Sequence, residues 1–169
     1  SVIVYGAGVS GRGAAEVLAK HGQQVFLYND TECKIEDGLA QALAANGGGL
    51  VCGNFAKLLG SNAGLLVLSP GVACDNENVL LAERSGVEVI SEVELAYRNY
   101  GGHIAAITGT NGKTTCTYLI KKVLEYSGYK VGLIGTNQNM IGDKVFETGR
   151  TTPDSFELWQ LFRQMADEN

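Results

Sequence analysis

The sequence contains no long apolar run, little proline and no closely spaced cysteines. No stretch approaches the ~20 consecutive apolar residues that a membrane-spanning helix needs, and only 2 of the 169 residues are proline. The four cysteines, Cys33, Cys52, Cys74 and Cys116, form no C-x-x-C pair, so their spacing indicates neither a zinc site nor a compact disulfide framework. Residues 1–5 carry no basic leader. We therefore expect a soluble cytoplasmic protein with reduced thiols and no membrane partner.

Positive charge is also scarce. Lys and Arg total 13 against 18 Asp and Glu, which gives a formal net charge of −5, and Lys and Arg form no cluster. Clustered cations bind nucleic-acid backbones, so we expect no nucleic-acid partner. What the sequence does have is 45% hydrophobic residues and 23 glycines. This composition is typical of an α/β protein with many tight turns, and the length predicts one or two domains.

A loop of the phosphate-binding type lies in the second half. Residues 104–107 are apolar and predict a buried strand, residues 108–115 read Thr-Gly-Thr-Asn-Gly-Lys-Thr-Thr, and apolar residues then recur at helical spacing. Such a loop turns backbone N–H groups toward one point, where an anion binds. Lys113 would reach the terminal phosphates of ATP, and the Thr114 hydroxyl would hold Mg²⁺. Both are therefore candidate catalytic residues for the transfer of a phosphoryl group. The predicted ATP-binding residues are Gly109, Thr110, Asn111, Gly112, Lys113, Thr114 and Thr115.

This loop departs from the general Walker pattern at one position. That pattern has glycine five residues before Gly112, where this sequence has Ile107, so the match is to the shorter Gly-x-x-Gly-Lys-Thr form. The octapeptide resembles the ATP loop of the Mur ligase family, whose members add amino acids to the UDP-N-acetylmuramoyl carrier of peptidoglycan precursors. Asn111 is similar to the members that add the second or third residue. Folylpolyglutamate synthases share the loop but usually follow the lysine with Gly-Ser, whereas this chain has Thr114-Thr115.

A second glycine-rich turn lies near the N-terminus. Residues 2–5 predict a buried strand, residues 6–11 read Gly-Ala-Gly-Val-Ser-Gly, and small and apolar residues then continue at helical spacing to Gly22. A strand at 24–28 leads to Asp30, nineteen residues past Gly11, where an acidic residue commonly contacts a ribose. The pattern predicts nucleotide binding. NAD is the first nucleotide that the fingerprint suggests, and a purely structural turn is the alternative.

The remainder of the first hundred residues predicts strands at 65–68 and 87–90 and helices at 35–45, 76–85 and from Ser91 onward, with Ser91 as N-cap. Residues 6–11, 69–72 (Ser-Pro-Gly-Val) and 91–95 (Ser-Glu-Val-Glu-Leu) together resemble the N-terminal domain of the Mur ligases that add D-glutamate. That resemblance implies that this part binds the UDP end of the substrate. It assigns Val9 and Ser10, with Gly8 and Gly11 beside them, to the diphosphate, Asp30 and Thr31 to the uracil, and Ser69, Pro70 and Gly71 to the same pocket.

Residues 130–155 resemble a different branch of the same family. They predict a strand at 130–134, a polar loop at 135–139, a hairpin arm at 143–147 and a helix capped by Thr152, with Pro153 at its first position. The loop and residues 150–155, Arg-Thr-Thr-Pro-Asp-Ser, are similar to the members that add the third residue, diaminopimelate or lysine. The resemblance makes Asn139, Thr151, Thr152 and Ser155 candidate contacts to the muramoyl peptide.

The sequence thus predicts an α/β fold in two parts. A Rossmann-like parallel-sheet domain for the UDP substrate would occupy residues 1–100, and the beginning of a P-loop ATPase α/β domain would occupy 101–169. The resemblance implies an ATP-dependent amide ligase that adds D-glutamate to UDP-N-acetylmuramoyl-L-alanine through an acyl phosphate, with ATP, Mg²⁺, the UDP-linked muramoyl peptide and an amino acid as partners. A third-residue ligase, an NAD-dependent oxidoreductase and a non-catalytic nucleotide-sugar-binding module are the alternatives. We expect this chain to lack the domain that selects the amino acid and to be inactive alone.

Overall fold

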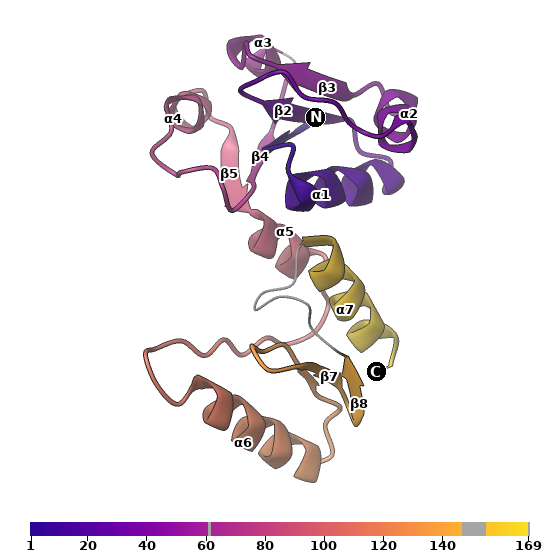
Figure 1. The fold of residues 1–169 in the computed structure, drawn as a ribbon, viewed down its shortest axis with the longest axis vertical. Coiled ribbons are helices and arrows are strands. Elements are labelled where there is room, and N and C mark those ends of the chain that lie inside the picture. The colour runs from indigo at the N-terminus through magenta and orange to yellow at the C-terminus, as the bar shows by residue number, and fades with distance from the viewer. Residues whose placement is uncertain (61, 147–154, 169) are drawn as a thin grey trace. The chain divides into compact units, whose positions relative to one another are not determined.

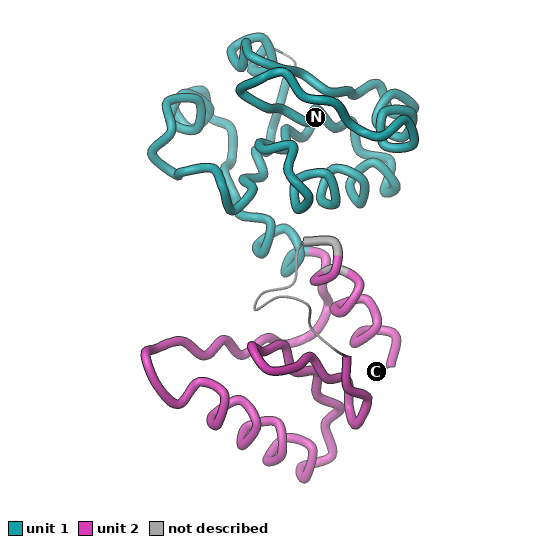
Figure 2. The backbone as a smooth tube through the Cα atoms, in the orientation of Figure 1, with its two compact units in different colours: residues 1–98, 154–156 teal, residues 99–153, 157–169 magenta. Residues whose placement is uncertain are grey.

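The computed structural model describes residues 1–60, 62–146 and 155–168. The chain divides into two compact units, the first built on residues 1–98 and the second beginning at Asn99 (Figure 2). Helices and strands alternate through the first unit, whereas the second has two longer helices and short strands (Figure 1). The predicted α/β fold class is confirmed.

The first unit is built on a five-stranded sheet in which every pairing is parallel. Its strands, in the order β3-β2-β1-β4-β5, are β1 (Val2–Tyr5), β2 (Val25–Asn29), β3 (Gly49–Cys52), β4 (Leu65–Leu68) and β5 (Glu88–Ser91). β1 is the central strand, and Tyr5 at its end is in register with Tyr28 on one side and Leu68 on the other. This is the doubly wound arrangement of nucleotide-binding sheets.

Helices cover both faces of this sheet because successive side chains of a strand point to opposite faces. Val2 and Val4 of β1 pack in one apolar cluster with α1 (Val9–Lys20), α2 (Asp37–Ala45) and α5 (Glu92–Arg98). Ile3 and Tyr5 pack in a second cluster with α3 (Ala56–Leu59) and α4 (Glu77–Arg84). Burial of both faces explains why β1 and β4 read as continuous apolar runs rather than as alternating ones.

Side chains cap two helices of this unit, and the predicted cap at Ser91 is confirmed. The Ser91 hydroxyl accepts a 3.1 Å hydrogen bond from the N–H of Glu94 at the start of α5, and the Asn76 side chain accepts one of 2.8 Å from the N–H of Asn78 in α4. β3 and α3 were not predicted. The glycines before β3 indicated only a helix end, but a Cβ on Gly48 would lie 2.0 Å from the Val25 carbonyl oxygen, so this glycine also lets the chain approach β2.

The second unit contains α6 (Lys113–Tyr126), a small antiparallel sheet and, from Glu157 onward, α7 (Ser155–Asp167). The sheet has the order β6-β7-β8, with β6 (Gly132–Leu133), β7 (Asn139–Ile141) and β8 (Lys144–Phe146). Ile141, Leu161 and Met165 form its buried cluster, and the rings of Tyr100 and Phe162 stack against each other at 4.9 Å. The predicted hairpin arm is confirmed as β8, whereas the strand predicted at 130–134 is only the two residues of β6.

The predicted buried strand at 104–107 is wrong for the described structure. No strand is present there, and Ile104 is 44% exposed. A strand forms only where a neighbour takes up its backbone hydrogen bonds, and the described sheet of this unit pairs β6, β7 and β8 without it. The helix predicted after the loop is confirmed as α6, but Leu119, Ile120 and Val123 on it are exposed, whereas Lys121 is buried and paired with Glu125.

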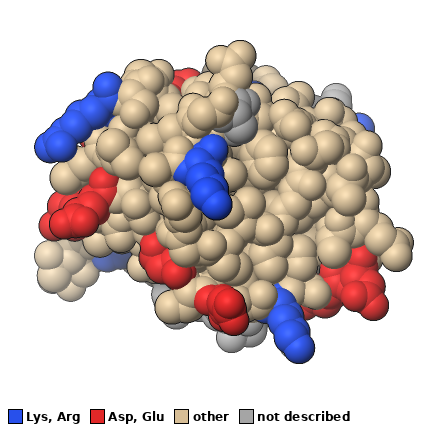
Figure 3. Space-filling view, turned by 90° about the horizontal axis from the view of Figure 1, so that it is seen from above, with Lys and Arg blue, Asp and Glu red and all other residues tan. Residues whose placement is uncertain are grey.

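Charged side chains are scattered over the surface. On the face seen in Figure 3, Lys and Arg side chains alternate with Asp and Glu among uncharged residues, and no large area of one sign appears. None of the described helices combines the length and the apolar character needed to span a bilayer.

Candidate functional site

The order of the strands in the first unit determines where a ligand can bind. The chain moves from β1 outward to β2 and β3, and then returns to the other side of β1 with β4 and β5. In such a sheet the loops after β1 and β4 run in opposite directions, which leaves a crevice between them. Ligands bind in this crevice, at the carboxyl ends of these two strands. Here those loops are Gly6–Gly8 and Ser69–Gly71, so the structure brings two predicted segments to one edge of the sheet.

The first loop leads directly into α1 and leaves the N-terminus of this helix open. Gly8 occupies the N-cap position without a side-chain hydrogen bond to the helix, so the N–H groups of Val9, Ser10 and Gly11 have no partner from within the first turn. Gly11 allows close packing, because a Cβ there would lie 1.8 Å from the Gly6 carbonyl oxygen. A row of free N–H groups at a helix N-terminus suits a diphosphate.

Arg12 fixes the conformation of this turn. Its Nε donates to the Ala7 carbonyl oxygen at 2.8 Å, and its two terminal nitrogens donate to the Lys34 carbonyl oxygen and the Glu36 carboxylate. The carboxyl pKa of Glu36 is lowered, first by hydrogen bonding to its own backbone and then by the Arg12 charge. Sequence reasoning missed Arg12, which here holds the turn against the segment after β2 rather than offering its charge to a phosphate.

Asn29 joins the turn to the loop that carries Asp30 and Thr31. Its side-chain oxygen accepts from the Ala7 N–H at 3.2 Å, and its side-chain nitrogen donates to the Thr31 carbonyl oxygen at 2.9 Å. Asp30 and Thr31 are exposed, and the Asp30 carboxylate accepts hydrogen bonds of 2.7 and 2.8 Å from the Tyr5 hydroxyl. The two residues predicted to bind uracil therefore lie on a loop that is hydrogen-bonded to the last residue of β1.

Ser69 is buried and its hydroxyl is used inside the protein. It donates to the Glu92 carboxylate at 2.7 Å and lies 3.3 Å from the Gly6 carbonyl oxygen. Pro70 and Gly71, which follow it, are exposed. Ser69 thus contacts the glycine-rich turn from the buried side, whereas Pro70 and Gly71 in the same loop are accessible to a ligand.

The second loop has the backbone shape expected of a phosphate cradle. Gly109 and Gly112 have φ of 127° and 81°, values that glycine adopts without strain, and α6 begins immediately afterwards without a side-chain cap. The Lys113 ammonium donates to the Gly109 carbonyl oxygen across the loop. Residues 109–115 are all exposed. The seven predicted ATP residues therefore lie together, around an open helix N-terminus.

Comparison with known proteins identifies the family to which the two loop-bearing parts of the chain belong. The family model described as "Mur ligase MurD-like, N-terminal domain" matches residues 1–91, which is more than half of the chain, and "Mur ligase middle domain" matches residues 107–169. This chain belongs to the Mur ligase family. The resemblance predicted from its motifs is confirmed.

Relatives of this Mur ligase chain come from two branches. It is 36% identical over 161 residues to a UDP-N-acetylmuramoylalanine–D-glutamate ligase of Lachnospira eligens, covering 95% of this chain and 35% of the relative. It is 57% identical over 74 residues to a UDP-N-acetylmuramoyl-L-alanyl-D-glutamate–2,6-diaminopimelate ligase of Clostridium botulinum, covering 43% of this chain and 15% of the relative. The chain thus spans about a third or less of the length of these two relatives.

Among solved structures, the Mur ligase chain matches a UDP-N-acetylmuramate:L-alanyl-gamma-D-glutamyl-meso-diaminopimelate ligase from Neisseria meningitides. The two share 23% identity with a TM-score of 0.46, and the match covers 89% of this chain and 45% of that one.

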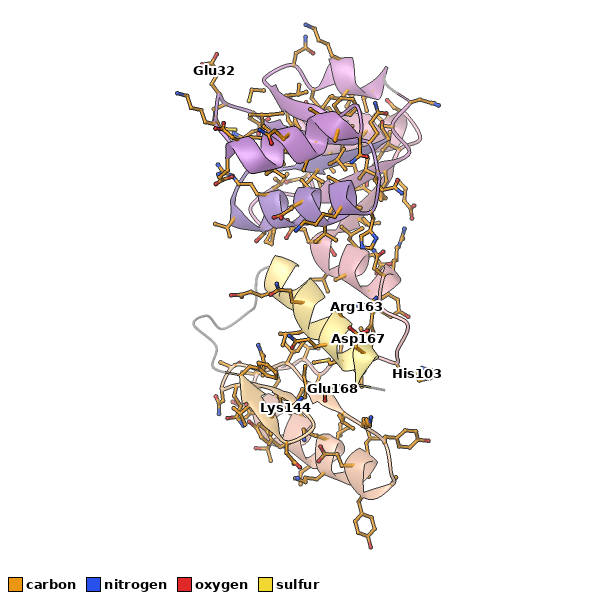
Figure 4. The ribbon with its side chains drawn as sticks, turned by 90° about the vertical axis from the view of Figure 1, so that its right-hand side faces the viewer. Glu32, His103, Lys144, Arg163, Asp167 and Glu168 are labelled. Atoms are coloured by element: carbon orange, nitrogen blue, oxygen red, sulfur yellow. The ribbon has the colours of Figure 1, made fainter. Side chains whose placement is uncertain are left out.

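The remaining predicted substrate residues of the Mur ligase chain come from its last third, and the structure describes two of them, Asn139 and Ser155. Asn139 is buried, and its side-chain oxygen accepts from the Gly135 N–H at 3.3 Å, so it closes the loop before β7. Thr151 and Thr152 lie outside the described residues, and Ser155 is the first residue of α7. His103 is exposed. Lys144 of β8 pairs with Glu168 at 2.6 Å, and Figure 4 labels these three side chains.

Two cysteines of the Mur ligase chain that are distant in sequence meet in the first unit. The Sγ atoms of Cys33 and Cys52 lie 3.9 Å apart, whereas Cys74 and Cys116 are exposed. Burial, followed by the hydrogen bond with Cys52, raises the pKa of the Cys33 thiol. The described residues contain no group of three or more His, Cys, Asp and Glu that could hold a metal ion.

Proposed function

We propose that this chain carries the UDP-substrate and ATP sites of an ATP-dependent amide ligase in peptidoglycan precursor synthesis. The ligase would act in the cytoplasm and add D-glutamate to UDP-N-acetylmuramoyl-L-alanine. The observation that carries the proposal is the uncapped N-terminus of α1 at the edge of the sheet where β1 and β4 end, with Asn29, the residue before Asp30, hydrogen-bonded to Ala7 of the preceding turn. The 36% identity to a D-glutamate ligase over 95% of the chain supports the choice of amino acid.

The UDP end of the substrate would bind to the first unit, in a domain of residues 1–100. The N–H groups of Val9 and Ser10, between Gly8 and Gly11, would bind the diphosphate, because a helix N-terminus favours negative charge. Asp30 and Thr31 would bind the uracil, and Pro70 and Gly71 would border the same pocket, with Ser69 beneath them. Asn139, Thr151, Thr152 and Ser155 would contact the muramoyl peptide.

ATP would bind to the loop before α6, in a domain that begins at residue 101. A Cβ on Gly109 or Gly112 would meet nothing within 4 Å, so the loop is not covered at these two positions. Gly112 and Lys113 lead into uncapped N–H groups, which suit the β- and γ-phosphates. Thr114 offers a hydroxyl oxygen of the kind that Mg²⁺ takes in phosphate-binding loops. Bound Mg²⁺ would neutralise charge that develops on the phosphate oxygens.

The proposed reaction is the one that membership of the Mur ligase family implies. An oxygen of the substrate carboxylate forms a bond to the γ-phosphorus of ATP, the bond to ADP breaks, and an acyl phosphate results. The amino group of D-glutamate then attacks the acyl carbon, phosphate leaves, and the amine loses a proton. Lys113 and the loop N–H groups would stabilise the charge on the phosphoryl group during the first step.

A diaminopimelate ligase is the second candidate, because the 57% identity over 74 residues is to an enzyme of that name. A natural protein that contains this sequence should release phosphate from ATP with UDP-N-acetylmuramoyl-L-alanine and D-glutamate. Release only with the UDP-linked dipeptide and diaminopimelate would support the second candidate. Calorimetry on the 169-residue chain should detect UDP and Mg-ATP at separate sites, and a titration with NADH should give no fluorescence change. Binding of NADH without UDP would contradict both ligase assignments.

A further inference from the structure

The hydroxyl of Tyr5 holds the carboxylate of Asp30 from inside the first unit. Tyr5 is the last residue of β1 and is 1% exposed, whereas Asp30 is exposed. The single hydroxyl proton lies between both carboxylate oxygens, at donor distances of 2.7 and 2.8 Å. A hydrogen bond shared by the two oxygens restrains rotation of the carboxylate about its own bond. The Tyr5 ring is in turn packed against Phe55 and Tyr28, so the hydroxyl itself has a defined position.

Asn78 of α4 completes this arrangement. Its side-chain nitrogen lies 3.2 Å from an Asp30 oxygen and 3.3 Å from the Tyr5 hydroxyl, so its two protons can serve both. The Tyr28 hydroxyl lies 2.6 Å from the Gly53 carbonyl oxygen and 3.2 Å from Asp30. Because a phenol has one proton, the Tyr28 hydroxyl donates it to the nearer acceptor, the Gly53 carbonyl oxygen. Tyr5 is therefore the principal tyrosine donor to Asp30.

Asp30 keeps further capacity to accept hydrogen bonds. An ionised carboxylate can accept about four, and within the described residues the Tyr5, Asn78 and Tyr28 groups lie within hydrogen-bonding distance of it. The remaining lone pairs belong to an exposed residue on the loop next to the glycine-rich turn. A ligand would thus meet a carboxylate whose orientation is fixed before binding, which reduces the entropy lost in the complex.

We propose that Tyr5, together with Asn78, is a positioning residue that makes Asp30 selective for uracil over cytosine. This inference rests on the proposed binding of a UDP-linked substrate to the first unit. Uracil presents one ring N–H between two carbonyl groups, whereas cytosine presents an amino group beside a ring nitrogen that is itself an acceptor. A carboxylate that turns freely can adapt to either pattern. One that is held by Tyr5 can match only one of them, and the mismatch leaves two acceptors facing each other.

The experiment compares UDP and CDP binding by calorimetry on the 169-residue chain and its Tyr5→Phe variant. We expect the wild type to prefer UDP. Tyr5→Phe should weaken UDP binding by about tenfold while CDP affinity changes little, because the lost bond is one to a charged group. The matched control is Tyr28→Phe, which removes the same hydroxyl from the same aromatic group but leaves the Tyr5 bond intact. This control should keep the preference within about twofold.

Each result bears on a different statement. If Tyr5→Phe leaves the ratio of UDP to CDP affinity unchanged, whether both affinities fall equally or neither falls, the positioning role is overturned while the nucleotide site stays in place. A wild-type chain that binds neither nucleotide would overturn the proposed function and, with it, this inference. Thermal unfolding of each free variant checks that it is folded. Should Tyr5→Phe fail to fold, Asn78→Ala on the half-buried face of α4 replaces it, with a loss of preference of about threefold or more expected.

Discussion

The hydroxyl of Ser69, just after β4, donates a 2.7 Å hydrogen bond to the carboxylate of Glu92, the first residue of α5. Both side chains are buried, at 8% and 4% exposure. A hydrogen bond between two buried groups contributes more than an exposed one, because water cannot replace the lost partner. The pair therefore joins α5 to the loop that supports the glycine-rich turn.

Replacing this hydroxyl should destabilise the first unit. Ser69→Ala is expected to lower the free energy of unfolding by about 1–3 kcal/mol, since the Glu92 carboxylate loses a donor. The control is Ser85→Ala, whose exposed hydroxyl bonds only to the Leu81 carbonyl oxygen among the described contacts, and which should cost about 0.5 kcal/mol or less. Denaturant unfolding measures the free energy of unfolding of both variants. Equal values for Ser69→Ala and Ser85→Ala would refute the importance of the buried pair.

Two glycines of the same turn should respond differently to alanine. A Cβ on Gly11 would lie 1.8 Å from the Gly6 carbonyl oxygen and 2.6 Å from the Ser69 hydroxyl, whereas a Cβ on Gly8 meets nothing within 4 Å. Gly11→Ala should therefore lower stability by about 1–3 kcal/mol through overpacking, and Gly8→Ala should lower it less, by under about 1 kcal/mol, because only the N-cap preference for glycine is lost. Thermal unfolding compares them, and a stable Gly11→Ala variant would contradict the close approach described here.

Removing the Lys113 ammonium should impair ATP binding without unfolding the chain. Lys113 is exposed and bonds to the loop carbonyl of Gly109, so little packing is lost. Lys113→Met is expected to weaken Mg-ATP binding by about 10- to 100-fold, since charge-assisted contacts to phosphate are lost. Lys122→Met, on the same helix and also exposed, is the control. Calorimetry with equal affinities for both variants would count against the ATP site.

The thiol of Cys33 should react more slowly than the exposed cysteines. Its raised pKa, caused first by burial, means that less thiolate exists at a given pH, and the thiolate is the nucleophile. With a disulfide reagent at pH 8, Cys74 and Cys116 should be modified first, and the rate at Cys33 should rise further as pH increases. Because Cys52 is also half-buried, the test is made in a Cys52→Ser background, where Cys33→Ser should remove the slow phase. A slow phase that persists in the double variant would contradict the assignment.

Tyr28 should make stability depend on alkaline pH. Burial raises its pKa to about 12, with Asp30 as the next cause, from about 10 in the unfolded chain. Between these values the folded chain holds a proton that the unfolded chain has lost, so stability falls as pH rises from about 10 to 12. Tyr28→Phe should reduce this slope, whereas Tyr126→Phe, at a 96% exposed position, should not. Denaturant unfolding at several pH values measures the difference.

Local pattern was sufficient for much of the first unit. The apolar runs at 2–5 and 65–68 and the caps at Asn76 and Ser91 lie in the elements that the sequence predicts. Local sequence did not predict β3, because its glycine-rich start is equally typical of a helix end. It also predicted a strand at 104–107 that the described structure does not contain, because a strand depends on neighbours elsewhere in the chain.

The sequence by itself determined the family, the two glycine-rich loops and the helices that follow them, because turn glycines, caps and helical periodicity act over a few residues. Only the tertiary structure decided which groups control those loops. Tyr5 and Asn78 are far apart in the chain, yet both reach Asp30, and Ser69 and Glu92 meet beneath the turn. Such contacts depend on strand order and register, which place distant residues at one edge of the sheet.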